Sequence, residues 1–280
     1  MMYSAVCFTV FLWILLHRGS AQLLDVNCGT VSHHDEHLIS GSPWMALIIL
    51  PNKTCSGTLI YKQFVITSAN CLVDQNDSSS TLWLPSNITI RLGNLKSLKL
   101  KNISDEYPPK NYYVQSAYVH SLYDKSNSNN DIALLELEED VLYKANIKPI
   151  CIWLDDIDLK VFKHFSTTLW YVDKNENHSK SRTNTITHFH PSKCINALKM
   201  SPQNTMICAG YKNENIGVES GSPLINYIRY YNNTLFTLFG IQSYGDLGTF
   251  IYTDVTNYID WIVGIILEVD VVVNTRTPFF

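Results

Sequence analysis

Phe64-Val65-Ile66-Thr67-Ser68-Ala69-Asn70-Cys71 is the stretch around which the chain is organised. Its first four residues are apolar or β-branched and predict a buried strand, and the remainder predicts a tight turn fixed by its cysteine. Asn129–Leu137 places Asp131 at the mouth of a second apolar strand. Val218–Leu224 presents Ser220 in a turn of small residues before a third strand. An amide, a carboxylate and a hydroxyl side chain thus each stand at the end of a predicted strand.

Length and composition are those of an ordinary globular protein. The chain has 280 residues, of which 46% are hydrophobic and 16% are charged, with a formal net charge of −4 at pH 7. This length is enough for one large all-β domain or two small ones. The mild acidity and the lack of a basic run argue against nucleic acid as a partner.

Residues 1–21 are predicted to form a signal peptide. Cys7–Leu16 is an apolar run too short to span a bilayer, and the small residues Gly19-Ser20-Ala21 follow it as a cleavage pattern. A buried core strand or an uncleaved anchor is the alternative interpretation of this run. We therefore expect a secreted, extracellular protein that is not held in a membrane, with a polar N-terminal segment over residues 22–42.

The cysteines and sequons fit that compartment. Removal of residues 1–21 leaves six cysteines, an even number that suits three disulfides outside the cell. Six Asn-x-Ser/Thr sequons predict a glycoprotein. The sequons begin at Asn52, Asn76, Asn87, Asn102, Asn177 and Asn232.

Short apolar or alternating runs separated by turns predict an all-β sandwich or barrel. A turn is predicted at Lys53–Gly57. The strands expected in the first half are Trp44–Leu50, Thr58–Thr67, Ile88–Gly93, Tyr112–Val119 and Ile132–Leu137. Those expected in the second half are Thr167–Val172, Thr183–His188, Thr205–Ala209, Leu224–Tyr230, Leu235–Tyr244 and Thr249–Thr253.

The helix that the sequence predicts follows the last strand. Apolar residues recur there at helical spacing, namely Val255, Tyr258, Ile259, Ile262 and Ile266. Residues 268–280 form a C-terminal tail that contains an apolar run of three valines. This tail fits either an additional strand or an unpaired segment.

Several motifs occur in an order that resembles the trypsin/chymotrypsin-like serine proteases. They are Pro43–Ala46, Cys55–Ile60, Phe64–Cys71, His120–Asp124, Asn130–Leu135, Ile207–Gly210, Ser220–Leu224 and Gly240–Gly245. The resemblance extends over nearly the whole mature chain and assigns residues 43–267 to this domain. Within the family, the chain looks like the secreted insect-type inactive serine protease homologues. The resemblance implies an all-β fold of two packed six-stranded β-barrels, with the active cleft between the barrels and the last helix on the second barrel.

The resemblance also implies how the cysteines pair. The implied disulfides are Cys28–Cys151, Cys55–Cys71 and Cys194–Cys208. The family's usual bridge beside the specificity pocket is missing from both ends, because Ile216 and Leu247 or its neighbours stand where its cysteines would be.

By the same resemblance, Asp131 and Ser220 occupy two positions of a catalytic triad, and Asn70 occupies the position of its histidine. The triad mechanism of this family needs a base that accepts the proton of the serine. An amide side chain has no nitrogen that titrates near neutral pH, so it neither accepts that proton nor returns it. The sequence therefore predicts a degenerate triad.

Further departures from the family concern the oxyanion site, activation and the pocket. Val218 replaces the glycine whose backbone N–H is an oxyanion donor, and Glu219 replaces the aspartate that pairs with the N-terminus formed on activation. No basic residue precedes His37–Gly41 in the way that activation cleavage requires. Glu214 occupies the base of the specificity pocket, while Phe250 replaces a wall glycine and is expected to fill it.

These departures predict no enzymatic activity and no cofactor. We expect a secreted serine protease homologue that binds extracellular proteins (proteases, their substrates or inhibitors) as a cofactor, decoy or regulator in a proteolytic cascade. A weakly active serine endopeptidase with an atypical triad is the alternative, and a structural or storage glycoprotein is a third interpretation.

Two polar clusters are candidate metal sites. His188 and His190 would share a face of an extended strand, but no cysteine or carboxylate nearby completes a tetrahedral set, which favours a surface strand. The acidic run after the Asp131 strand could be a solvated turn or a cation site, and the solvated turn is the preferred interpretation. The sequence therefore predicts no metal.

Overall fold

The computed structural model of the chain describes residues 23–30, 42–73, 81–93, 108–172, 179–211, 217–246 and 248–269. Several sequence predictions lie outside this part: the signal peptide, Glu214, Ile216, Leu247, the sequons at Asn76, Asn102 and Asn177, and the tail beyond residue 269.

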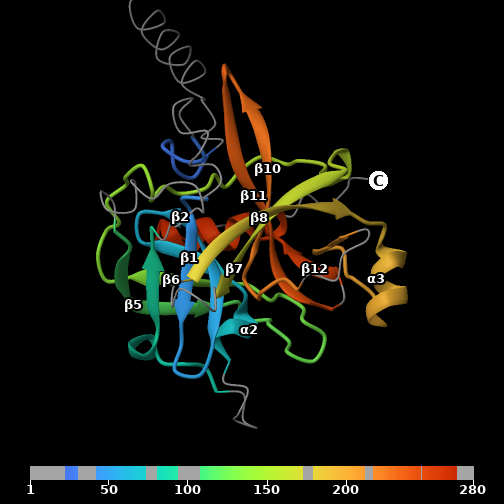
Figure 1. The fold of residues 1–280 in the computed structure, drawn as a ribbon, viewed down its shortest axis with the longest axis horizontal. Coiled ribbons are helices and arrows are strands. Elements are labelled where there is room, and N and C mark those ends of the chain that lie inside the picture. The colour runs from blue at the N-terminus through green and yellow to red at the C-terminus, as the bar shows by residue number, and fades with distance from the viewer. Residues whose placement is uncertain are drawn as a thin grey trace, which may run out of the picture.

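The first half of the chain forms a closed barrel of six antiparallel strands (Figure 1). The order around the barrel is β1(Met45–Ile49), β2(Thr54–Tyr61), β3(Phe64–Thr67), β6(Ala133–Leu137), β5(Lys110–Val119) and β4(Thr89–Leu92). The short helix α2(Ala69–Leu72) follows β3, and a 3₁₀ turn η3(Pro85–Asn87) precedes β4.

The second half forms another closed barrel of six antiparallel strands. Its order is β10(Pro223–Tyr230), β11(Asn233–Asp246), β12(Thr249–Asp254), β9(Met206–Gly210), β8(Ser179–His188) and β7(His164–Val172). Its helical elements are η4(Leu159–Val161), α3(Pro191–Leu198), η5(Val255–Tyr258) and α4(Ile259–Ile266). The prediction of two six-stranded barrels with a helix after the last strand is confirmed.

Apolar side chains from both barrels and from α4 form a shared core. Ile60 and Ile66 of the first barrel, Leu238 and Ile241 of the second, and Ile262 of α4 belong to one buried cluster. Each of these five side chains is at most 2% exposed. Because burial of a large aliphatic side chain stabilises by about 1.5–3 kcal/mol, this cluster joins the two barrels into one packed unit.

The predicted strand Thr58–Thr67 in fact belongs to two strands, β2 and β3. The chain breaks at Lys62–Gln63, whose carbonyl groups accept hydrogen bonds from Val141 and Leu137. The predicted turn at Lys53–Gly57 is also wrong, because β2 already begins at Thr54 and pairs with β1 over most of that stretch. The stretch that begins at Thr54 is polar in composition, which favours a turn, but the strand is buried from Cys55 to Ile60.

Helix α3 was not predicted. Cys194 is its one buried residue and Leu198, four residues later, packs partly buried against the same cluster, so the apolar face of this eight-residue helix is too short to give a clear period. Its start does follow a local rule: the ring of His190 accepts a hydrogen bond from the Ser192 N–H, and Pro191 takes the first helical position.

All three implied disulfides are present: Cys28–Cys151, Cys55–Cys71 and Cys194–Cys208. The first ties the segment before β1 to the second barrel, where the backbone of Gly29 exchanges hydrogen bonds with Phe236 and Pro149. Asp25 attaches the same segment to the first barrel, because it accepts a hydrogen bond of 2.6 Å from the hydroxyl of Tyr143, which packs against the first barrel's core.

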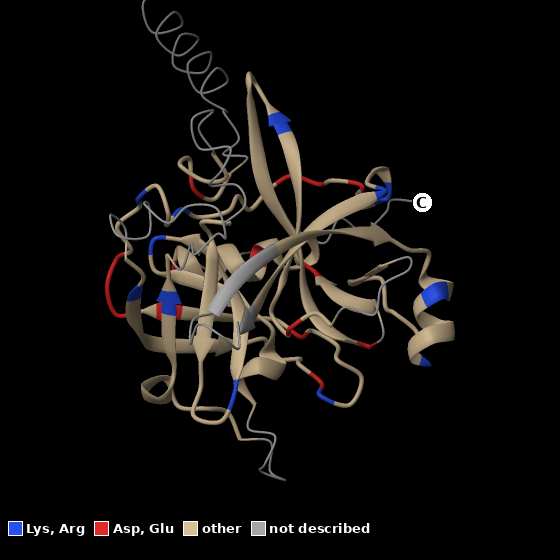
Figure 2. Cartoon of the chain, in the orientation of Figure 1, with Lys and Arg blue, Asp and Glu red and all other residues tan. Residues whose placement is uncertain are grey.

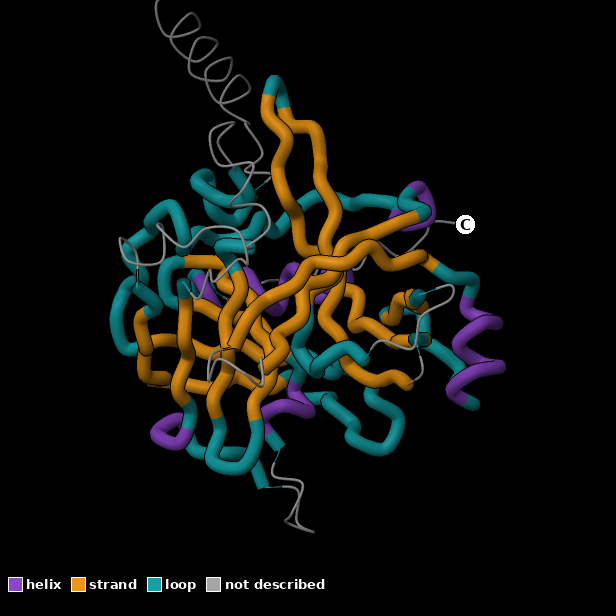
Figure 3. Tube along the Cα trace, in the orientation of Figure 1, coloured by secondary structure: helices purple, strands orange, loops and turns teal. Residues whose placement is uncertain are grey.

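A long hairpin of β10 and β11 projects from the body of the molecule (Figure 3). Three exposed aromatic side chains lie on it, Tyr227 at 56%, Tyr231 at 86% and Tyr244 at 43% exposure. Asn232, which begins a sequon, lies in its turn and is exposed, as are Asn52 and Asn87. Glycosylation of these sequons stays a prediction. In the described part of the chain, no helix combines the length and apolar character needed to cross a bilayer.

The disulfides differ in the loops that they close, and their contributions to stability should differ accordingly. Cys28–Cys151 spans 123 residues and Cys194–Cys208 spans 14. The loop-entropy relation predicts that paired replacement of Cys28 and Cys151 by alanine lowers the free energy of unfolding by about 2 kcal/mol more than paired replacement of Cys194 and Cys208. Urea unfolding of both variants measures this difference, and equal losses would contradict it.

Candidate functional site

Strand pairing brings together the three residues that the resemblance assigns to a catalytic triad, Asn70, Asp131 and Ser220. Thr67 at the end of β3 pairs with Ala133 at the start of β6, which sets Asn70 on α2 beside Asp131. Ser220 comes from the second barrel, and its backbone carbonyl accepts a hydrogen bond of 3.0 Å from the Ser56 N–H on β2. The site therefore lies where the two barrels meet.

Asn70 is hydrogen-bonded to both of the other residues. Its backbone N–H donates to Asp131 Oδ1 at 2.8 Å. Its side-chain Nδ2 donates to Ser220 Oγ at 3.2 Å and to the backbone carbonyl of Ser243 at 3.0 Å. The group beside the serine hydroxyl is thus a hydrogen-bond donor, whereas a general base must accept a proton.

Asp131 is fully buried and is held from several sides. The Ser243 hydroxyl donates to its Oδ2, and the Thr253 hydroxyl donates to its backbone carbonyl at 2.9 Å. Burial raises the pKa of the Asp131 carboxyl to about 6, although the hydrogen bonds from Ser243 and Asn70 act in the opposite direction. Ionisation of the Asp131 carboxyl group is therefore costly at this position.

The turn that carries Ser220 is pressed against the first barrel. Gly221 has a φ of +83°, and a Cβ on it would collide with the backbone carbonyl of Ser56 and the hydroxyl of Thr67. Its own N–H donates to the Gln242 carbonyl at 2.9 Å. Both the left-handed backbone and this close approach require glycine at this position.

Glu219 is turned towards β2. Its carboxylate accepts hydrogen bonds from the Ser56 hydroxyl at 3.0 Å and from the Thr54 hydroxyl at 3.3 Å. Burial raises its pKa, while these two hydrogen bonds partly oppose the shift. Sequence reasoning missed both partners, because Thr54 and Ser56 fall in the stretch that was predicted to be a turn.

Phe250 is 1% exposed and belongs to the core of the second barrel. Its ring meets Tyr211 edge-on, with centroids 6.1 Å apart. It also lies so close to Gly245 that a Cβ there would collide with the ring. Val218 packs against the same cluster. A phenyl ring therefore occupies the position where the family resemblance implies a pocket wall of glycine.

Ser243 has a role in the site that the sequence did not reveal. It supplies a hydroxyl to Asp131 and a carbonyl to the Asn70 side chain. It lies within the Gly240–Gly245 motif, so the motif was recognised but the contribution of this residue was not. Its position on β11, next to β12, depends on pairing that composition does not specify.

The two histidines considered as a metal pair serve separate local purposes. His188 Nδ1 lies 3.0 Å from the Phe162 carbonyl, and His190 caps α3.

The carboxylates of the acidic run have partners of other kinds. Glu136 accepts a hydrogen bond from the Tyr118 hydroxyl, and Glu139 forms an exposed ion pair of 2.8 Å with Lys110. The described Lys and Arg residues are spread over separate elements (Figure 2).

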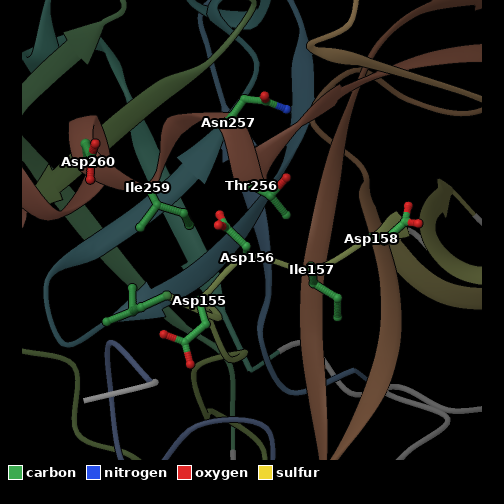
Figure 4. Close-up of a pocket in the computed structure, with 9 residues that line it drawn as sticks. Asp155, Asp156, Ile157, Asp158, Thr256, Asn257, Ile259 and Asp260 are labelled. Atoms are coloured by element: carbon green, nitrogen blue, oxygen red, sulfur yellow. The ribbon is translucent and has the colours of Figure 1, made fainter. Parts of the chain in front are cut away.

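A hollow of about 470 Å³ beside η5 is lined by several carboxylates (Figure 4). They belong to Asp155, Asp156, Asp158 and Asp260. Among the residues that the structure describes, no three or more His, Cys, Asp or Glu side chains form a group that could hold a metal ion. The acidic lining alone does not make this hollow a metal site.

Comparisons with known proteins agree with this architecture. The family model described as Trypsin matches residues 31–262. Vitamin K-dependent protein C of Rattus norvegicus is 28% identical over 250 residues, which cover 82% of this chain and 50% of that protein. Ovochymase of Halocynthia roretzi is 29% identical over 242 residues, covering 81% of this chain and 14% of that protein.

An insect protein is also among the relatives. CLIP domain-containing serine protease B10 of Anopheles gambiae is 26% identical over 243 residues, which cover 79% of this chain and 65% of that protein. The chain thus spans less than two thirds of the length of each of these relatives. The family match covers most of the chain and coincides with the two barrels and the site between them, and the chain therefore belongs to the trypsin family of serine proteases.

Proposed function

We propose that this protein is a secreted, catalytically inactive serine protease homologue that acts by binding other extracellular proteins. Its role would be that of a cofactor, decoy or regulator in a proteolytic cascade. The observation that carries the proposal is the hydrogen bond from Asn70 Nδ2 to Ser220 Oγ. An amide N–H directed at the serine oxygen is a donor and offers no site for the proton of the hydroxyl, so Ser220 has no general base at this position.

The surroundings of Ser220 support the same proposal. Replacement of one triad member in a working enzyme of this kind lowers kcat by up to about a millionfold, and the remaining rate comes from the oxyanion hole and binding. By the family resemblance Val218 stands at an oxyanion position, and Phe250, whose ring lies against Gly245, stands where a glycine would line the specificity pocket. The remaining contributions to rate are thus weakened as well.

Glu219 adds a further argument. Its carboxylate already has two hydroxyl partners on β2, Thr54 and Ser56. A partly buried carboxylate with satisfied hydrogen bonds has less to gain from pairing with a newly formed N-terminus. We infer that cleavage of the N-terminal segment would not rearrange this turn.

Extracellular localisation is supported by chemistry that suits an oxidising compartment. Three disulfides form within the described chain, and such bonds persist outside the cell but rarely in the cytosol. One of the relatives named above is called a CLIP domain-containing serine protease, and a partner role among extracellular proteases is a proposal for this chain.

A weakly active serine endopeptidase is the second candidate. One observation favours it: the contacts that fix Asp131, from Ser243 and Thr253, are present together with Ser220. In this alternative a water or a substrate group would take the proton of Ser220. The two candidates differ in whether Ser220 behaves as a nucleophile.

Covalent labelling with a fluorophosphonate probe tests the lack of a nucleophile. Wild-type protein should remain unlabelled under conditions in which an active trypsin-family protease is labelled completely, because Asn70 donates to Ser220 Oγ and provides no base that could take its proton. The matched control is Ser220→Ala, whose background signal should equal that of wild type. Labelling of wild type that disappears in Ser220→Ala would establish the endopeptidase alternative and refute the inactive homologue.

Asn70→His shows whether the missing base is the main defect. We expect this variant to label weakly or not at all, since Val218 and Phe250 are unchanged. A rate close to that of the active reference protease would place the whole defect at residue 70.

The binding role is tested separately. Wild-type protein immobilised on a resin and exposed to extracellular fluid of its source should retain a protein partner, and this partner should be recovered uncleaved. Retention of no protein would count against the cofactor role.

The Asp131 carboxyl should leave a signature in the pH dependence of stability. Its folded pKa of about 6 lies above the ordinary value of 3.8, so the folded protein holds its proton more tightly than the unfolded chain. The free energy of unfolding should therefore fall as pH rises between about 4 and 6, by roughly 3 kcal/mol for a shift of this size. Above about pH 6 this contribution no longer changes.

Urea unfolding of wild type and Asp131→Asn across pH 4–6 measures this effect. The variant should show a shallower fall over this range, whatever its absolute stability. Asp124→Asn is the control: hydrogen bonds from Ser126 lower the pKa of Asp124, so its contribution is lost below about pH 4 and its replacement leaves the slope at pH 4–6 unchanged. Equal slopes for wild type and Asp131→Asn would contradict the assignment.

A further inference from the structure

A second hollow, of about 640 Å³, opens along α4. Aromatic rings form part of its wall, where the ring of His120 lies 5.4 Å, centroid to centroid, from both Tyr258 and Trp261. The Tyr258 hydroxyl donates a hydrogen bond of 3.0 Å to Asn130 Oδ1, which holds that ring in place. The hollow is therefore a preformed concavity with aromatic walls, the usual form of a binding site.

Aliphatic side chains continue this wall towards the C-terminal end of α4. Ile265 and Val269 also line the hollow. Val269 is 49% exposed, and Leu267, two residues before it, is 51% exposed. Exposed apolar groups that gather around a concavity are a feature of protein interaction sites. The hollow thus suits an apolar side chain of a partner.

The charges on the wall of this hollow favour a cation. Burial lowers the pKa of His120, so its ring is neutral at pH 7, and its Nδ1 accepts a hydrogen bond of 3.3 Å from the Leu122 N–H. Asp260 supplies a carboxylate to the lining. Among the described residues that line this hollow, none is lysine or arginine. A cation near these aromatic rings meets a carboxylate and no like charge, and the ring faces attract it further.

The acidic hollow of Figure 4 continues the same surface. Asn257 and Asp260 line both hollows, so the two adjoin. The exposed carboxylates of Asp155, Asp156 and Asp158 line the acidic one, and no lysine or arginine is among its described lining residues. Grouped carboxylates attract a cationic partner and repel an anionic one. An apolar hollow beside an acidic one is thus complementary to a segment with an apolar side chain beside basic ones.

We propose that the two adjoining hollows form a docking surface for a basic segment of another extracellular protein. An apolar side chain of that segment occupies the aromatic hollow, and its lysine or arginine side chains lie against Asp260 and the carboxylates of residues 155–158. The inference deepens the proposed binding role and rests on it, because it names the chemistry of the partner. It makes no use of Ser220, so it can fail while the site around Ser220 proves inactive.

Peptide selection on the full-length protein tests the proposal. The probe is a library of random peptides displayed on phage, from which binders are selected on immobilised wild type and then made as synthetic peptides. We expect the selected peptides to combine several basic residues with an aromatic or large aliphatic one. Enrichment of no peptide, or of peptides without basic residues, would overturn the proposal.

Charge reversal locates where these peptides bind. Asp156→Lys should weaken their binding at least tenfold, because it places a like charge against their basic residues. The matched control is Glu138→Lys, which makes the same change at an exposed carboxylate that lines neither hollow, and it should alter the affinity less than twofold. Equal losses in the two variants would reveal general attraction by net charge and would refute a docking surface here.

A second pair of variants tests the apolar hollow. Val269→Ser should weaken peptide binding at least threefold, whereas Leu142→Ser, at a leucine that is 69% exposed and lines neither hollow, should leave it unchanged. Affinity that neither Asp156→Lys nor Val269→Ser changes would overturn the docking surface and leave the inactive homologue standing. Fluorophosphonate labelling of Ser220 would have the opposite effect, since it would refute inactivity without touching this surface.

Discussion

The contact between the Ser220 turn and strand β2 is the constraint on which the site depends. The N–H of Ser56 binds the Ser220 carbonyl, the Ser56 hydroxyl binds Glu219, and Gly221 leaves no space for a side chain against the Ser56 carbonyl. One residue of the first barrel thus fixes three consecutive residues of the second. The contacts that join the two barrels here are consequently the same contacts that set the geometry of the site.

This constraint explains how the protein keeps the shape of a protease site while its chemistry differs. The positions of Asn70, Asp131 and Ser220 follow from strand pairing and from the contact with β2, neither of which requires a histidine. The amide of Asn70 forms hydrogen bonds with Ser220 and Ser243, so its own donor group is satisfied within the site. An asparagine at this position therefore has a small structural cost.

Much of the fold could be predicted from the sequence, because its signals are local. Buried runs such as Phe64–Thr67 and alternating runs such as Thr89–Leu92 have the burial that their patterns indicate. The disulfides and the candidate site followed from ordered motifs. Helix α3 could not be predicted in this way, because its eight residues place only Cys194 and Leu198 against the core, which is too few to show a helical period. Long-range contacts set the second limit: the hydroxyl partners of Glu219 lie more than 160 residues before it, and nothing in the local sequence connects them.

The hairpin of β10 and β11 has a consequence for how this chain can vary among related proteins. Both of its roots belong to the site, since β10 begins just after Ser220 and β11 carries Ser243. Its tip, by contrast, stands clear of the body (Figure 3). Because strand side chains alternate with a period of two, gain or loss of residue pairs at the tip preserves the pairing below it. The hairpin can thus change in length over generations while the hydroxyl and carbonyl groups at its base keep their positions.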